Sequence, residues 1–111
     1  MWNHQQQGAT SIVSGKGPLN LESVDAASRT FERGVSLGIP RIVFDMNEIL
    51  LVDSSGLELM LDTLETCENR GGSLRLARPN ALCQDILRIT EVDKRFEVYS
   101  DPVTAAGSFT V

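Results

Sequence analysis

An acid, two hydroxyls and a glycine stand together where an apolar segment gives way to an expected helix. Asp53, Ser54, Ser55 and Gly56 follow directly after Ile49–Val52. The serines are therefore predicted at a helix N-terminus, where unpaired backbone N–H groups and the positive end of the helix dipole stabilise an anion. A phosphate attached to the serine itself is such an anion, so the motif indicates a switch rather than an enzyme.

Structural roles compete with this interpretation at each position. Serine after an extended segment most often caps the helix that follows. Asp53 could cap the helix, hold a serine hydroxyl in place or take part in a partner's phosphotransfer geometry. Gly56 inside a helix costs about 0.5–1 kcal/mol relative to alanine. Close approach of a partner or a neighbouring loop, or a steric need of the turn, would compensate.

Enzyme chemistry finds little support elsewhere in the chain. His4 is the sole histidine and lies in a glutamine-rich terminus, which argues against a histidine-based triad. Carboxylate pairs such as Asp62 with Glu65 fit the solvated face of a helix. The chain lacks the G-x-x-x-x-G-K-[ST] and G-x-G-x-x-G patterns. We therefore expect neither catalytic residues nor a cofactor or metal.

Composition narrows the class of protein. The 111 residues suffice for one domain with a single core. A net charge of −5, with ten scattered basic residues, argues against nucleic acid as a partner. The first seven residues lack the features of a secretory signal, and the chain lacks a run of about 20 apolar residues. We expect a cytoplasmic protein without membrane insertion, and we expect Cys67 and Cys83 to be buried, reduced thiols.

Two helices and an apolar strand are expected to position the motif. The first helix begins at Asn20 as its N-cap and ends near Gly38, and the second runs from about Ser54 to Asn69 before Gly71 and Gly72. Between them, residues 41–46 form an almost continuous apolar run that continues through 49–52, as in a central strand covered on both faces. The core stripe of the first helix comprises Leu21, Val24, Ala27, Phe31 and Val35, and that of the second Leu57, Met60, Leu61, Leu64 and Cys67.

The remaining segments predict the rest of a layered fold. Residues 9–14 indicate a short strand with a partner in 2–6, and residues 73–77 and 96–99 indicate two more. Asn80 is expected to cap a third helix, and Asp101 with Pro102 opens a final short one. The buried side of the third helix is expected to comprise Leu82, Cys83, Ile86 and Leu87. Together these elements predict a single α/β domain with a mixed central sheet of four to five strands and about four helices.

One leucine of the second helix falls outside its core stripe. Leu59 is in line with Ser55, Asp62, Thr63 and Thr66, one turn from the serine motif. A lone exposed leucine is usually unremarkable. On a face whose other members are small or polar, it indicates a contact with a partner protein.

These motifs resemble the STAS domain family of sulfate transporters and anti-sigma factor antagonists. The resemblance rests on residues 41–46 (RIVFDM) and 51–57 (LVDSSGL), and three further segments fall in the family's order and spacing. Those segments are GPLN at 17–20, NRGGSLRL at 69–76 and LRITEVDKRFEV at 87–98. The resemblance covers about residues 10–108, with residues 1–9 as a poorly defined N-terminal edge.

The D-S-S-G-L form is similar to that of stand-alone bacterial anti-anti-sigma factors. The resemblance implies that Ser54, with Ser55 as the alternative, is phosphorylated by an anti-sigma factor. That partner is a serine kinase of the histidine-kinase-like ATPase fold, which the unphosphorylated antagonist sequesters so that a sigma factor is released. A serine phosphatase would reset the switch, and the free protein is expected to be a monomer. The expected partner-binding residues are Asn20, Asp53, Ser54, Ser55, Gly56, Leu59, Asp62 and Thr63.

One departure from the family's pattern leaves an alternative open. Relatives often carry an acid where this chain has Asn20, so a negative charge that could aid kinase recognition is absent. A different class of function is a non-phosphorylated STAS scaffold that serves a transporter, a lipid-export complex or a signalling assembly. In that case the second helix would dock constitutively.

Overall fold

A mixed five-stranded sheet organises the chain, with strand order β1-β2-β4-β6-β7. The computed structural model describes residues 1–36 and 38–109. β1 is antiparallel to β2, and the pairs β2–β4, β4–β6 and β6–β7 are parallel. This confirms the predicted mixed sheet and the predicted pairing of the first two strands. The strand bounds are Asn3–Gln7 (β1), Thr10–Ser14 (β2), Arg41–Asp45 (β4), Ser73–Ala77 (β6) and Val98–Tyr99 (β7).

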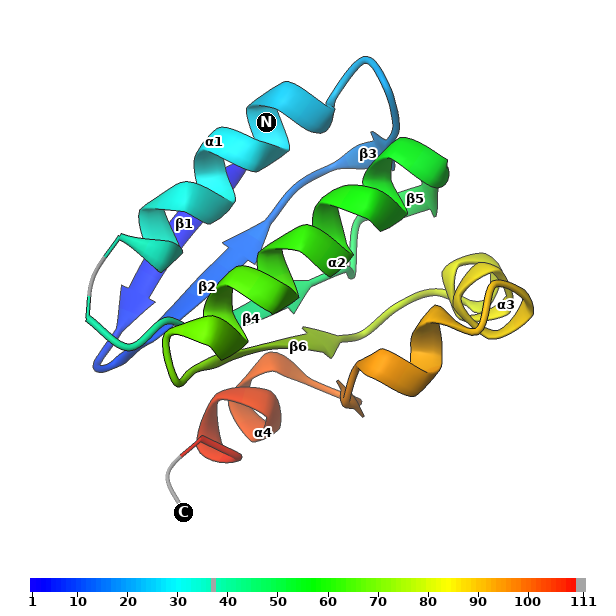
Figure 1. Ribbon diagram of the computed structural model, residues 1–111. Coiled ribbons are helices and arrows are strands. Elements are labelled where there is room, and N and C mark those ends of the chain that lie inside the picture. Colours follow the sequence, from blue (N-terminus) through cyan, green and yellow to red (C-terminus); the bar gives the residue numbers. More distant parts are fainter. Residues whose placement is uncertain (37, 110–111) are drawn as a thin grey trace.

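Helices pack on both faces of this sheet (Figure 1). α1 and α2 lie side by side on one face and run in the same direction, whereas α4 packs against β4, β6 and β7 on the other. α3 lies beside β5 and is followed by a short 3-10 helix at Val92–Arg95. The helix bounds are Val24–Val35 (α1), Ser54–Asn69 (α2), Ala81–Ile89 (α3) and Pro102–Gly107 (α4).

β4 is the central strand that its apolar sequence predicted. Ile42 and Phe44 belong to the main core beneath α1 and α2, while Val43 packs with Ala105 of α4 on the opposite face. Ile42, Val43 and Phe44 are completely buried. Burial on both faces explains why this strand is continuously apolar rather than alternating.

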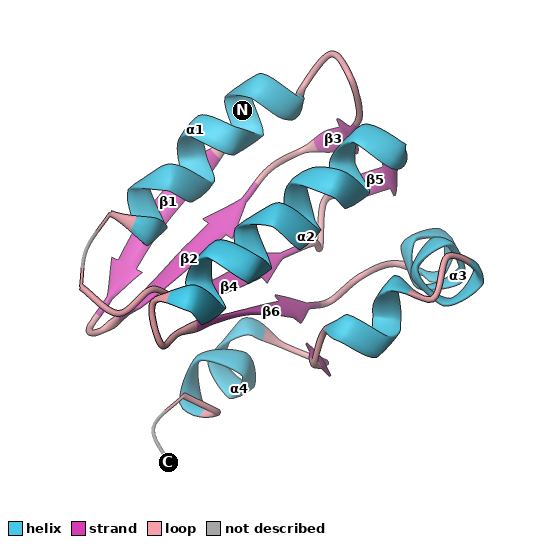
Figure 2. Ribbon diagram, in the orientation of Figure 1, coloured by secondary structure: helices cyan, strands magenta, loops and turns pink. Residues whose placement is uncertain are grey.

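A second, two-stranded sheet joins β3 (Gly17–Leu19) to β5 (Ile49–Val52) in parallel (Figure 2). β3 was not predicted, and residues 49–52 were expected to continue the strand at 41–46. The chain instead turns after β4, with the Ile49 N–H donating to the Met46 carbonyl at 3.0 Å. Leu50 is 60% exposed, so β5 is not a fully covered strand.

The predicted start of the first helix was wrong. α1 begins at Val24 with Ser23 as its N-cap residue. Asn20 caps the preceding turn, because its Oδ1 accepts hydrogen bonds from the N–H groups of Glu22 (3.1 Å) and Ser23 (3.2 Å). Leu21, predicted in the core, lies outside the helical period and is 73% exposed.

α3 and α4 begin at the predicted caps, and α2 begins after Asp53, for which capping was one of the roles left open by the sequence. Asp53, Asn80 and Asp101 each accept a hydrogen bond from a backbone N–H in the first turn. One burial prediction in α3 was wrong, since Leu82 is 51% exposed. Cys67 is a buried, free thiol, as is Cys83. Among the described residues, we find no helix that is both long enough and apolar enough to span a membrane.

Candidate functional site

Asp53 fixes the start of α2. Its Oδ1 accepts a hydrogen bond from the Gly56 N–H at 3.0 Å, and its Oδ2 accepts one from the Leu21 N–H at 3.2 Å. The Asp53 N–H itself donates to the Leu19 carbonyl at 3.1 Å. Of the three roles open from the sequence, the geometry shows capping. The carboxylate also ties α2 to the turn that precedes α1.

Gly56 packs tightly against Leu19 of β3 and Val52 of β5. A Cβ atom at this position would lie 2.7 Å from both the Cγ and the carbonyl oxygen of Leu19, and 2.8 Å from Cγ1 of Val52. These separations are far below ordinary van der Waals contact. Close approach of the neighbouring chain segment therefore accounts for a glycine inside the helix.

The two serines occupy the first positions of α2 and differ in exposure. Ser54 is exposed and Ser55 is half-buried. The first helical hydrogen bond runs from the Leu57 N–H to the Asp53 carbonyl at 2.9 Å, so the N–H groups of both serines precede it. These groups, together with the helix dipole, give the Ser54 environment partial positive character.

Exposed apolar side chains border this site. Leu21 follows Asn20 and is tied to Asp53 through its N–H. Leu51, two residues before Asp53, is 37% exposed. Leu21 was predicted in the core because the first helix was expected to begin at Asn20 rather than at Val24. The usable signal was Ser23, which is a strong N-cap type three residues after Asn20.

The other predicted partner residues lie further along α2, in a groove shared with α1. Leu59, Asp62 and Thr63 all line this groove, which has a volume of about 340 Å³. Leu59 is half-buried and contacts the core, Asp62 is exposed, and Thr63 is only 7% exposed. The eight predicted residues thus form two adjoining groups. Asn20, Asp53, Ser54, Ser55 and Gly56 surround the start of α2, and the other three line the groove.

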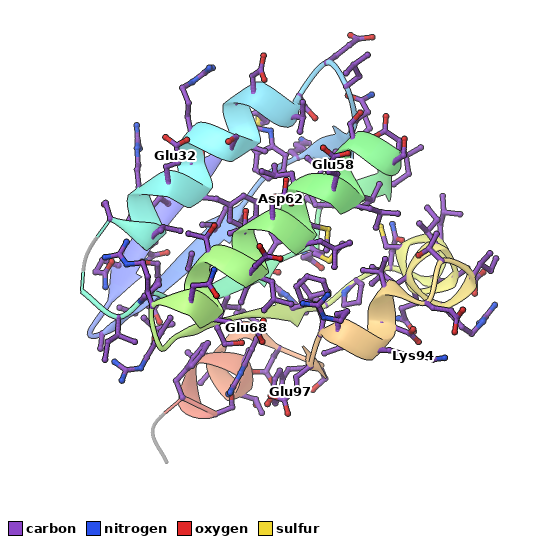
Figure 3. The ribbon with its side chains drawn as sticks, viewed as in Figure 1. Glu32, Glu58, Asp62, Glu68, Lys94 and Glu97 are labelled. Atoms are coloured by element: carbon purple, nitrogen blue, oxygen red, sulfur yellow. The ribbon has the colours of Figure 1, made fainter. Side chains whose placement is uncertain are left out.

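The exposed side of α2 is negatively charged. Figure 3 shows Glu58, Asp62 and Glu68 along this helix and Glu32 on α1. α2 carries four acids and neither lysine nor arginine. Glu68 lies 3.7 Å from Arg95, measured between Oε1 and Nη2, and we find no ion pair for Glu58, Asp62 or Glu65 within the described part of the chain.

Within the described part of the chain, the acids do not gather into a metal site and both cysteine thiols are buried. Among residues 1–36 and 38–109, we find no group of three or more His, Cys, Asp or Glu side chains that could hold a metal ion. Burial raises the pKa of the Cys67 thiol to about 11, and burial also raises the pKa of Cys83. Both thiols are therefore protonated and unreactive near neutral pH.

Comparisons with known proteins show similar sequences and a similar fold. An anti-sigma factor antagonist of Thermotoga neapolitana, provisionally so named, is 24% identical over 89 residues, which are 79% of this chain and 79% of that protein. The crystal structure of a provisionally named anti-sigma factor antagonist from Thermotoga maritima has a TM-score of 0.88 at 19% identity, and the match covers 96% of this chain and 92% of that one.

SpoIIAA has a similar structure in two states. The anti-sigma factor antagonist SpoIIAA in its unphosphorylated form gives a TM-score of 0.80 at 13% identity, with 100% of this chain and 98% of that chain covered. The Bacillus cell fate determinant SpoIIAA in its phosphorylated form gives 0.75 at 15% identity, with 98% and 99% covered. At these identities the structural matches show a shared fold. The STAS domain family model matches residues 1–105, nearly the whole chain, and the protein therefore belongs to the STAS domain family.

Proposed function

We propose that this protein is an anti-sigma factor antagonist controlled by phosphorylation of Ser54. The observation that carries the proposal is an exposed serine at the first position of α2, beside an aspartate whose two carboxylate oxygens are already engaged. The Ser54 hydroxyl is open to a kinase, whereas Ser55 is half-buried. Names of relatives supply the biological context, because two similar proteins are provisionally named anti-sigma factor antagonists.

The proposed partner is an anti-sigma factor that is also a serine kinase of the histidine-kinase-like ATPase fold. The unphosphorylated antagonist binds this partner and frees a sigma factor, and a serine phosphatase restores the binding form. The kinase supplies the catalytic groups, so the antagonist contributes only the acceptor and the docking surface. The setting is a bacterial cytoplasm, and the free antagonist is a monomer.

Phosphorylation of Ser54 would weaken partner binding by adding negative charge to the buried part of the interface. A phosphoserine carries about −1.5 to −2 charges and three acceptor oxygens. Placed at Ser54, it adds like charge next to Asp53, whose carboxylate cannot move without losing its bonds to Gly56 and Leu21. An interface formed around a neutral hydroxyl must then desolvate a dianion. A penalty of about 2.8 kcal/mol weakens binding roughly a hundredfold.

The test compares Ser54→Asp with Ser54→Ala in calorimetric binding to the anti-sigma factor kinase. We expect Ser54→Asp to lose affinity roughly a hundredfold, while Ser54→Ala keeps binding but takes up no phosphate. Ser55→Asp tests the alternative acceptor, and a larger loss of affinity than for Ser54→Asp would assign the switch to Ser55. A modest effect of Ser54→Asp would instead favour a constitutive scaffold. Leu59→Ala should weaken binding, and unchanged affinity would remove Leu59 from the contact surface.

A further inference from the structure

The groove between α1 and α2 has an apolar floor that is not fully covered. Phe31 of α1 lies at its base and is 1% exposed. Val35 and Leu59 contact the core from the two sides of the groove but remain partly open to solvent. The hydroxyl-bearing residues Ser28, Thr63 and Thr66 complete the lining. An apolar side chain of a partner could therefore be buried here against three apolar residues.

The rims of the groove are acidic. Glu32 from α1 and Asp62 from α2 are both exposed and both line it (Figure 3). Glu58 and Glu65 extend the negative charge along α2 in both directions. Within the described part of the chain, none of these four acids forms an ion pair. The rims therefore favour a cation between them.

Arg70 lies next to Val35, one of the residues that line the groove. The Arg70 guanidinium donates to the carbonyl oxygens of Val35 (2.5 Å) and Gly38 (3.0 Å), so its charge is held at the C-terminal end of α1. The opposite end of the groove leads along α2 towards Ser54, since both helices run in the same direction (Figure 1).

We propose that this groove docks a cationic amphipathic helix of the partner kinase. Apolar side chains of that helix enter between Val35 and Leu59, and its lysines or arginines face Glu32 and Asp62, as in other helix-in-groove interactions. The identity of the partner rests on the proposed function. The chemical character of that helix is inferred from the groove itself. An apolar floor between unpaired acids is complementary to a cationic amphipathic helix, whereas it would repel an acidic segment.

Docking in the groove is separate from the phosphorylation switch. Leu59 is five residues from Ser54 and Asp62 is eight, which places them about 7.5 and 12 Å along the helix axis. The screening length at physiological salt is about 8 Å, so a phosphate on Ser54 changes the potential at Asp62 only weakly. The groove therefore holds the kinase with similar strength before and after phosphorylation. Phosphorylation of Ser54 weakens only the contact at the start of α2.

A peptide experiment tests the groove without the kinase. The isotope-labelled protein is titrated by NMR with an amidated helical peptide of leucine, alanine and lysine, and with a scrambled peptide of the same composition. We expect shifts confined to the groove lining and at least tenfold weaker binding to the Glu32→Gln/Asp62→Asn variant. The Glu48→Gln/Asp93→Asn variant, which loses the same charge elsewhere, should bind like the wild type. Equal effects of both variants, equal binding of the scrambled peptide or shifts at another surface would overturn the proposal.

Binding to the kinase then separates this inference from the proposed function. The Glu32→Gln/Asp62→Asn change should weaken kinase binding by the same factor in wild-type and Ser54→Asp backgrounds. If that change has no effect while Ser54→Asp does, the groove proposal fails and the switch stands. If Ser54→Asp has no effect while the groove variant weakens binding, the switch fails and the groove proposal stands.

Discussion

Replacing Gly56 with alanine should destabilise the protein even though alanine is the better helix former. The added Cβ would lie 2.7 Å from the Leu19 carbonyl oxygen, a backbone atom that also accepts a hydrogen bond from the Asp53 N–H. Leu19 is completely buried, and its carbonyl oxygen is part of a strand that pairs with β5. Relief of the clash requires β3 and the start of α2 to separate, which lengthens that hydrogen bond.

The size of the effect follows from two opposing terms. Overpacking a rigid site costs about 3 kcal/mol at the upper end of its usual range. Replacing glycine by alanine inside a helix returns about 1 kcal/mol. The net loss is about 2 kcal/mol, which corresponds to a fall in Tm of about 8 °C for a domain of this size. In urea the midpoint should fall by roughly 1 M.

Urea and thermal unfolding followed by circular dichroism measure this loss, with Gly107→Ala as the matched control. Gly107 ends α4, and a Cβ atom there would meet nothing within 4 Å. The control should be unchanged or more stable by about 0.4–1 kcal/mol. If Gly56→Ala proves as stable as the wild type, or if both variants shift alike, the close approach to Leu19 is not the reason for the glycine.

Two further predictions concern the cap and a buried thiol. Asp53→Ala removes the acceptor of the Gly56 and Leu21 N–H groups and should cost about 1–2 kcal/mol in urea unfolding; unchanged stability would show that the cap is dispensable. Cys67, with its pKa raised from 9.0 to about 11 by burial, should react with iodoacetamide at pH 8.5 much more slowly in the native protein than in urea, as mass spectrometry can show. Equal alkylation rates in the native and unfolded states would contradict this burial. Because the thiol ionises at lower pH in the unfolded state, the free energy of unfolding should also fall as pH rises from about 9 to 11.

The sequence was sufficient wherever local chemistry determines the structure. Asp53 and Asn80 are strong N-cap residues directly before helical periods, and both helices begin where these residues predict. Residues 41–46 were identified as a central strand because burial on both faces requires a continuous apolar run. The candidate site was proposed for a similar reason, since an abrupt change from apolar to polar residues marks its position.

Elements that depend on tertiary contacts were not predictable in the same way. β3 contains Gly17 and Pro18, which locally indicate a turn, and it exists as a strand because it pairs with β5. Leu21 is exposed because α1 begins only at Val24, and its N–H is bonded to Asp53, 32 residues away. The reason for Gly56 likewise lies in Leu19, on a different strand. Such long-range contacts leave no periodic pattern in the sequence.

Site-resolved phosphopeptide mass spectrometry on the protein recovered from its native cells tests the central claim most directly. Growing and stressed cultures should both be sampled. The account predicts phosphate on Ser54, with an occupancy that changes between the two conditions. A Ser54 peptide that is unmodified in every condition would contradict it.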